Sequence, residues 1–206
     1  MKIDGHIHSP FCPHGSKDTF EKYIEKAIKN DFTHITFTEH APAPGEFVDT
    51  VPNKDSFMKM ELLDPYITEL QKLKNKYASS IQINIGLEVD YIQGFEEGTR
   101  NLLNKIGHHL DDSILSVHFL LHQNKYVCID FSPEQFALFV EEVGSLRTVY
   151  EYYYDTLRQS INANLGIYKP RRIGHPTLIH KFQHSHLEKF DDHDLIIRTL
   201  QDIRNH

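Results

Sequence analysis

The chain has 206 residues, of which 39% are hydrophobic and 13 are phenylalanine, enough apolar material for the core of a single domain over residues 1–206. Its formal charge of −7 argues against a nucleic-acid partner, because proteins that bind a phosphate backbone usually carry a basic face. No run approaches the roughly 18 unbroken apolar residues of a membrane span, and Cys12 and Cys128 are too few for a disulfide framework, so the sequence predicts a cytoplasmic protein with reduced cysteines and no membrane partner.

Short β-type runs alternate with helix-type runs along the chain, a pattern typical of a parallel sheet or barrel rather than of a sandwich. The first β-type run covers 2–8, and apolar residues at helical spacing predict a helix over 18–30. Asp18 and Glu21 fit a capping box at the start of that helix. The second β-type run covers 34–40.

The middle of the chain continues this alternation after one irregular stretch. Residues 41–53 contain three prolines, and we expect them to form a loop. Asp64 and Pro65 open the next predicted helix, because proline is favoured in the first turn of a helix. The third and fourth β-type runs cover 81–89 and 113–118.

The last third of the chain is mostly helical by pattern. Ser132 opens a long helix that runs through the tyrosine-rich segment 150–154, with at most a break near Gly144. The tyrosines are better explained by helix packing than by substrate binding. The fifth β-type run covers 171–175, and a final helix is predicted over about 191–204.

Three histidines, His6, His8 and His14, fall within nine residues of the first β-type run and its exit. In a chain with 15 histidines, chance is one explanation of this cluster. Metal binding is the other, because residues two apart in a strand share a face, so His6 and His8 can hold one ion.

The ends of the β-type runs favour metal over chance. Each run ends, or nearly ends, in a residue that can bind a metal: His8, His40, Glu88, His118 and His175. In barrels built of βα units the active site lies at the carboxyl ends of the strands. Imidazole and carboxylate ligands suit Zn, Fe or Mn, and a carboxylate such as Glu88 can bridge two ions. The sequence therefore predicts a multinuclear metal site.

The remaining histidines lack this placement, and we assign them to solvent or to ordinary hydrogen bonds: His34, His108, His109, His122, His193 and His206. A second cluster, His180, His184 and His186, follows the fifth β-type run. It could line the mouth of the site, but a solvated turn is the favoured interpretation.

The motifs around these residues resemble the polymerase and histidinol phosphatase (PHP) family of metal-dependent phosphoesterases, and within it the histidinol-phosphatase branch. The resemblance spans essentially the whole chain and is carried by HIH with a following PHG, FTEHAP, GLEVDY, SVHFL and RIGHPTLI. It implies an α/β fold, a distorted (β/α)7-type barrel, that binds two or three divalent transition-metal ions.

The resemblance also implies a role for each rim residue. His6 and His8 would hold one ion, and Glu88 would bridge it to a second. His118 and His175 would complete the second ion, while His14 and His40 would hold the third. Glu88 and His40 are the residues that we assign to the catalytic centre.

The chain departs from the family pattern after His175. The resemblance implies two further strands, the last with an Asp-x-His motif, whereas Asp192 and its neighbour His193 lie in a predicted helix with the wrong spacing. We expect a barrel incomplete at its C-terminal end, either because the chain is the front of a longer protein or because it is a naturally short relative. Association with a second copy is one way to cover the exposed strand edges.

The activity implied by the resemblance is hydrolysis of the small-molecule ester L-histidinol phosphate to L-histidinol and phosphate, a step of histidine biosynthesis. Two or three divalent ions would neutralise the phosphate and lower the pKa of bound water toward about 7, supplying hydroxide for attack on phosphorus. Arg158 and Arg198 are candidates for the phosphate-binding cations, because a guanidinium matches phosphate geometry.

Three alternatives stay open. One is the same chemistry on another small phosphoester, such as a nucleotide or sugar phosphate. Another is a folded metal-binding fragment without activity. An amidohydrolase, which also begins with an HxH motif, is a distant third, because those sites use a lysine-derived ligand where this chain offers Glu88.

Overall fold

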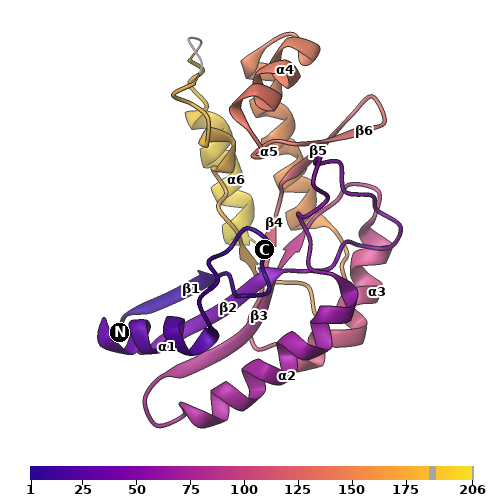
Figure 1. The fold of residues 1–206 in the computed structure, drawn as a ribbon. Helices are drawn as coiled ribbons and strands as arrows, with labels where there is room; N and C mark the ends of the chain where they lie inside the picture. The colour runs from indigo at the N-terminus through magenta and orange to yellow at the C-terminus, as the bar shows by residue number, and fades with distance from the viewer. Residues whose placement is uncertain (186–188, 206) are drawn as a thin grey trace.

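The computed structural model describes residues 1–185 and 189–205, and it is built on a curled sheet of five parallel strands (Figure 1). The strands follow the order β1-β2-β3-β4-β7 across the sheet. They are β1 (Ile3–Ile7), β2 (His34–His40), β3 (Gln82–Asp90), β4 (Ile114–Ser116) and β7 (Arg172–Ile173). All five predicted β-type runs are therefore confirmed, and the curled parallel sheet forms the half-barrel of a distorted βα barrel.

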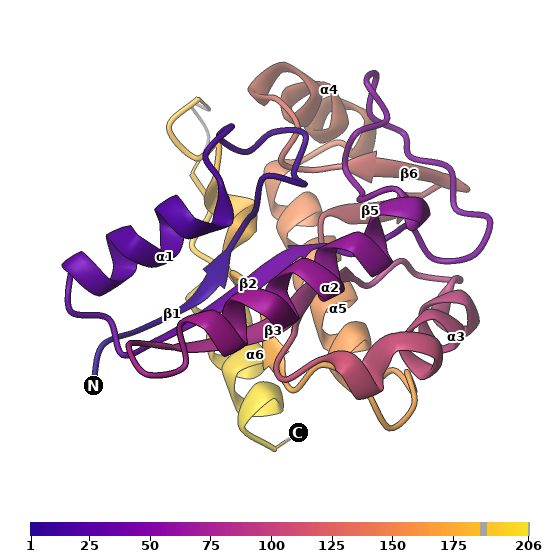
Figure 2. The same cartoon turned by 60° about the horizontal axis from the view of Figure 1, so that its bottom comes forward.

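Helices follow the strands and cover both sides of the sheet. They are α1 (Phe20–Lys29), α2 (Met60–Lys76), α3 (Glu96–Ile106), α4 (Pro133–Val143), α5 (Leu146–Asn162) and α6 (His193–Asn205), with short 3-10 turns η1 (Gly107–His109) and η2 (Leu178–His180). Helices α1 and α2 lie on one side of the sheet and α5 and α6 on the other (Figures 1 and 2). None of the helices in the described parts of the chain is long and apolar enough to cross a membrane.

The core forms where α2 packs on the sheet. Leu70 of α2 and Ile83 and Ile85 of β3 are almost completely buried. Tyr66, also fully buried, donates a hydrogen bond of 2.8 Å from its hydroxyl to the carbonyl of Gly86 in β3. This packing holds β2 and β3 in place, and both strands end at the candidate site.

Two helix starts differ from the sequence prediction. Helix α1 begins at Phe20, and Thr19 caps it by accepting a hydrogen bond from the backbone N–H of Lys22, so the predicted Asp18 capping box is wrong. Helix α2 begins at Met60, one turn before the predicted start, and contains Pro65. The earlier start buries Leu63, which is 2% exposed.

The predicted break at Gly144 is confirmed. Gly144 ends α4 with a φ of 98°, a left-handed conformation that glycine adopts without steric cost, and α5 begins at Leu146. The final helix, α6, also agrees with the prediction within two residues. His186 and His206, which we assigned to solvent or a surface turn, lie outside the described residues.

Helix α3 and a β-hairpin were not predicted. The hairpin pairs β5 (Phe119–His122) with β6 (Lys125–Cys128) antiparallel. Its two turn residues, Gln123 and Asn124, both have positive φ, as tight hairpin turns require. The strands are only four residues each, too short for a clear periodic pattern.

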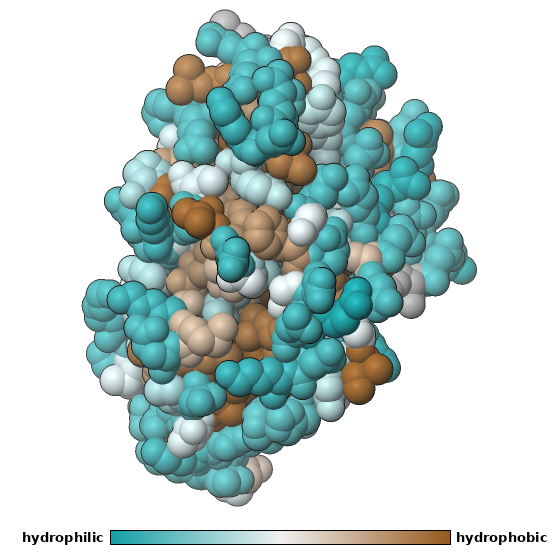
Figure 3. Space-filling model, turned by 90° about the vertical axis from the view of Figure 1, so that its right-hand side faces the viewer, coloured by the Kyte–Doolittle hydropathy of each residue, from teal (hydrophilic) through white to brown (hydrophobic). Residues whose placement is uncertain are grey.

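The hairpin anchors the proline-containing loop that follows β2. Phe47 and Phe57 of this loop lie 5.3 Å and 5.6 Å from the ring of Phe119 in β5, and Phe47 also contacts Tyr126 of β6. Figure 3 shows apolar residues gathered in the middle of one face of the molecule and bordered by hydrophilic side chains. The aromatic contacts give the loop a fixed position beside the carboxyl ends of the strands.

Candidate metal centre

Glu88, near the end of β3 and 1% exposed, lies at the centre of the predicted site. Its Oε2 is 3.2 Å from Nε2 of both His6 and His8. Its Oε1 is 2.8 Å from Nε2 of His175 and 3.6 Å from Nε2 of His118. Four imidazoles therefore surround one carboxylate, two on each oxygen: one lies in β1 and the other three follow the ends of β1, β4 and β7.

His40 and Ser116 complete the surroundings of this carboxylate. His40 ends β2 directly beside Glu88 in the strand register, and its Nδ1 is 3.5 Å from Glu88 Oε2. Ser116, at the end of β4, donates a hydrogen bond of 2.7 Å to Glu88 Oε1. The structure thus brings six of the seven predicted ligands together, because parallel strands present their carboxyl ends at one edge of the sheet.

His175 reaches the cluster through an unusual backbone turn after β7. Its φ of 22° is rare for a residue with a side chain. Gly174 before it passes so close to β4 that an added Cβ would lie 2.1 Å from the hydroxyl of Ser116. Such local strain is typical of functional sites.

The donor groups fit divalent cations. Although burial favours the neutral form, hydrogen bonds from His175, His6 and His8 hold the pKa of Glu88 far below its usual range, so it is a carboxylate. Buried Nδ1 of His40 has no hydrogen-bond partner, although it faces Glu88 Oε2. A buried nitrogen without a hydrogen-bond partner costs stability in a protein. A cation bound by both this nitrogen and the carboxylate oxygen would remove that cost.

His8 has a second buried neighbourhood, which the sequence analysis missed. Burial lowers the pKa of His8, but hydrogen bonds with Cys12, Glu39 and Glu88 raise it to about 12. Donor atoms of His8, Cys12 and Glu39 lie within 4.8 Å of one another, as do those of His40, Asp90 and His118. Cys12 is 4% exposed and free.

His14 stands apart from the other predicted ligands. Its side chain is 53% exposed, and its Nε2 is 3.1 Å from Oδ1 of Asp55 in the loop after β2. It borders the same pocket but joins none of the compact donor groups found among the described residues. Asp55 had no sequence signal, because it lies in an aperiodic loop.

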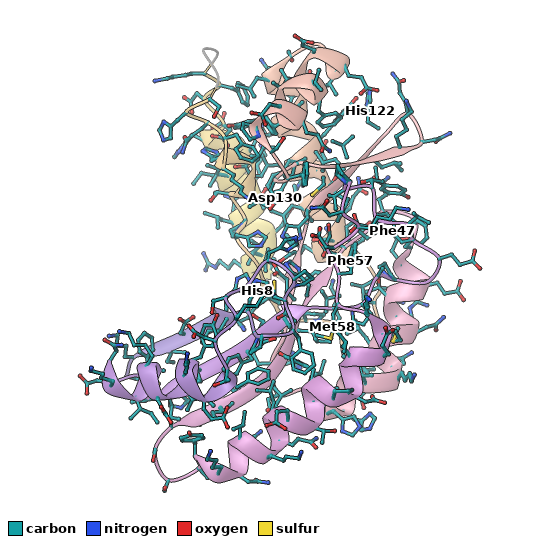
Figure 4. The ribbon with its side chains drawn as sticks, in the orientation of Figure 1. His8, Phe47, Phe57, Met58, His122 and Asp130 are labelled. Atoms are coloured by element: carbon teal, nitrogen blue, oxygen red, sulfur yellow. The ribbon has the colours of Figure 1, made fainter. Side chains whose placement is uncertain are left out.

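The cluster forms the floor of a pocket of about 450 Å³. This volume suits a small organic ligand. The walls are Val51, Asn53, Asp55 and Ser56 from the loop after β2, Phe119 and Cys128 from the hairpin, and Asp130, Phe131, Leu178 and Lys181 beyond it. Figure 4 labels two of the lining residues, His8 and, above it in this view, Asp130.

The two arginines that we expected to bind phosphate lie outside this pocket. Arg158 of α5 makes a 2.5 Å contact with Asp202 of α6, so it joins two helices, and Arg198 is exposed on α6. Lys181 lines the pocket instead, and its Nζ donates to the backbone carbonyl of Asp130 at 2.8 Å and to its carboxylate at 3.1 Å.

Among the described residues, the histidines that we assigned elsewhere are also outside the pocket. His180 bonds the carboxylate of Asp192 at 2.8 Å, so Asp192 binds this residue and Tyr154 rather than the cluster. His122 differs from the expectation of a solvated or hydrogen-bonded ring. It packs on Phe139 near α4, and its buried Nε2 has no partner (Figure 4).

A curled parallel sheet with histidines gathered around a buried carboxylate at its strand ends defines a metal-dependent hydrolase of the βα-barrel class. The chain belongs to the PHP family, because the sequence signature of the PHP domain matches residues 4–205. It is 51% identical over 182 residues to the histidinol-phosphatase of Bacillus subtilis (strain 168), covering 88% of this chain and 68% of that protein.

Two crystal structures share the fold. The candidate histidinol phosphatase hisK of Listeria monocytogenes superimposes with a TM-score of 0.92 at 38% identity, covering 99% of this chain and 79% of that one. A histidinol phosphate phosphatase of Lactococcus lactis, complexed with zinc, L-histidinol and phosphate, has a TM-score of 0.65 at 20% identity, covering 98% and 67%. The second likeness shows the fold alone.

Proposed function

We propose that the chain hydrolyses L-histidinol phosphate to L-histidinol and phosphate. The observation that supports this most is the division of Glu88 between two pairs of histidines, one pair on each oxygen. Identity of 51% to a histidinol-phosphatase points to the substrate. The two free cysteines agree with the cytoplasm, where a biosynthetic phosphatase would work.

The residues divide naturally between ion positions. His6 and His8 would share one ion with Glu88 Oε2, and His118 and His175 would share a second with Oε1. We assign His14 and His40 to a third. Divalent Zn, Fe or Mn ions held there would neutralise the phosphate and lower the pKa of bound water toward about 7.

The protein's own groups orient this centre. Ser116 donates to Glu88 Oε1 at 2.7 Å and so fixes the rotation of the carboxylate. His40 borders the other oxygen with an unpartnered nitrogen. Glu88 and His40 therefore set where a phosphate can approach, which is the catalytic role that we propose for them.

The pocket walls match the rest of the substrate. L-Histidinol phosphate carries an anionic phosphate, a cationic amine and an imidazole. We propose that Lys181 meets a phosphate oxygen, because a cation beside a phosphate forms charge-assisted hydrogen bonds. The carboxylate of Asp55 borders the same pocket and suits the cationic end. The aromatic contacts of Phe47 and Phe57 hold the wall that carries Asp55.

Phosphate release from a panel of esters tests the proposal. Metal-loaded protein should hydrolyse L-histidinol phosphate with a higher kcat/KM than nucleotide or sugar phosphates. The same protein stripped with a chelator, and then reloaded, gives the control for metal dependence. A higher kcat/KM on another ester would keep the metal chemistry but replace the substrate.

A further inference from the structure

Glu39 is an acidic residue on the core side of a strand. It shares a face of β2 with Ile35 and Phe37, and all three are 0% exposed. A buried carboxylate is costly unless hydrogen bonds compensate its lost hydration. Its position therefore needs an explanation beyond the packing of the sheet.

Both oxygens of Glu39 are fully used. Oε2 accepts hydrogen bonds from the backbone N–H of Ser9 at 2.9 Å and from its hydroxyl at 2.6 Å. Oε1 accepts from the backbone N–H of His40 at 2.9 Å and lies 3.1 Å from Nδ1 of His8. One carboxylate thus connects the ends of β1 and β2, two of the places where predicted ligands lie.

The contact with His8 fixes the state of that ring. A carboxylate only accepts hydrogen bonds, so Nδ1 of His8 must carry the proton. Nε2 is then the atom 3.2 Å from Glu88 Oε2, and it is the nitrogen whose lone pair a metal ion would take in place of a proton. Glu39 therefore turns the metal-binding nitrogen of His8 toward the bridging carboxylate.

Asp90 contacts Nδ1 of His118 in the same way as Glu39 contacts Nδ1 of His8. It is 4% exposed, and its Oδ1 lies 2.5 Å from Nδ1 of His118. Nε2 of His118 faces the other oxygen of Glu88 at 3.6 Å. The two carboxylates thus act on opposite sides of Glu88.

We propose that Glu39 and Asp90 are positioning residues, each of which serves one ion of the centre. Glu39 orients His8 for the ion on the Oε2 side of Glu88, and Asp90 orients His118 for the ion on the Oε1 side. The inference rests on the metal centre of the proposed function. A carboxylate that accepts a hydrogen bond from the second ring nitrogen of a metal-binding histidine typically raises metal affinity by roughly 10- to 100-fold.

The substitution Glu39→Gln tests the proposed role of Glu39 with little change in the size of the side chain. The two donors of Ser9 keep the amide oxygen on their side, so the amide NH₂ faces His8 Nδ1 and the backbone N–H of His40 and can accept from neither. The ring is then driven to the tautomer with the proton on Nε2. Ser9→Ala is the matched control, since it removes a hydrogen bond of Glu39 without touching the contact with His8.

Metal affinity is measured on protein stripped of metal and titrated with Zn(II) or Co(II) against a competing chelator. Glu39→Gln should weaken one equivalent by roughly 10- to 100-fold and alter part of the cobalt absorption spectrum, while Ser9→Ala binds like wild type. Asp90→Leu should weaken the other equivalent. Circular dichroism of each metal-free variant checks that it is folded.

Combining each substitution with His6→Ala shows which ion Glu39 and Asp90 each serve. In His6→Ala, which lacks a ligand on the Oε2 side, Glu39→Gln should have no further effect on the ion on the Oε1 side, whereas Asp90→Leu should weaken that ion. Wild-type affinity in Glu39→Gln, or equal losses in Glu39→Gln and Ser9→Ala, overturns the inference. Wild-type protein that binds no metal would instead overturn the proposed function, so the two failures are distinct.

Discussion

The guanidinium of Arg172 connects the two edge strands of the sheet, since its Nη2 donates a hydrogen bond of 2.9 Å from β7 to the carbonyl of Gly5 in β1. The same side chain pairs with Asp112 at 2.7 Å. A Cβ added to Gly5 would lie 2.9 Å from the guanidinium, so glycine leaves room for this contact. The curl that brings His6 and His175 to one carboxylate is thus stabilised by a side chain that spans the edges.

We expect Arg172→Met to lower the free energy of unfolding by about 1 to 2 kcal/mol, because it removes charge-assisted hydrogen bonds that are partly exposed. Chemical denaturation measures this change. Lys72→Met is the control, since Lys72 makes an exposed pair with Glu69 inside α2 and should cost less than about 0.5 kcal/mol. Equal losses would mean that the bridge between the edge strands is not stabilising.

Removal of bound metal should destabilise the protein. Four imidazoles surround one carboxylate and would bind a metal only in the folded state. A metal ion whose free concentration is 100 times its Kd stabilises that state by about 2.7 kcal/mol. For a chain of this size the midpoint Tm should fall by about 5 to 10 °C with a chelator. Calorimetry with and without added Zn(II) measures the shift, and an unchanged Tm would contradict metal binding at this cluster.

Glu88→Gln should reduce metal content by more than one equivalent, because its two oxygens face separate pairs of histidines. The loss of activity should exceed the roughly 10- to 100-fold expected for a residue that only hydrogen-bonds a metal ligand. Elemental analysis and phosphate release measure both effects. His34→Ala is the control, since His34 bonds Thr33 at the opposite end of β2. Similar losses in the two variants would show that the cluster is not the metal site.

Lys181→Met should lower kcat/KM on L-histidinol phosphate by roughly 10- to 100-fold, the loss expected for a charged hydrogen bond, while metal content stays unchanged. Arg158→Met and Arg198→Met serve as controls, because both arginines lie outside the pocket. Steady-state kinetics decide between these positions. A loss in an arginine variant with normal Lys181→Met kinetics would restore the phosphate site predicted from sequence.

The strand ends could be predicted because they follow from local rules. The β-type runs predicted all five parallel strands, and the shared edge of such strands is enough to place His40, Glu88 and His118 together. Glu39 was predictable in principle, since it interrupts the apolar face formed by Ile35 and Phe37.

Contacts across the fold were beyond the sequence. Asp55 and Lys181 reach the pocket from irregular segments that carry no periodic pattern. Arg158 was placed wrongly because a helix exposes arginine on several sides, and only the packing of α5 on α6 decides that it meets Asp202. The hairpin β5–β6 was missed because its strands are short.

Anomalous diffraction from crystals of the zinc-loaded protein tests the central claim most directly. We predict two zinc peaks beside Glu88, one in contact with Oε2, His6 and His8, and the other in contact with Oε1, His118 and His175. A single peak held by His8, Cys12 and Glu39, or zinc bound away from Glu88, would contradict a centre bridged by this carboxylate.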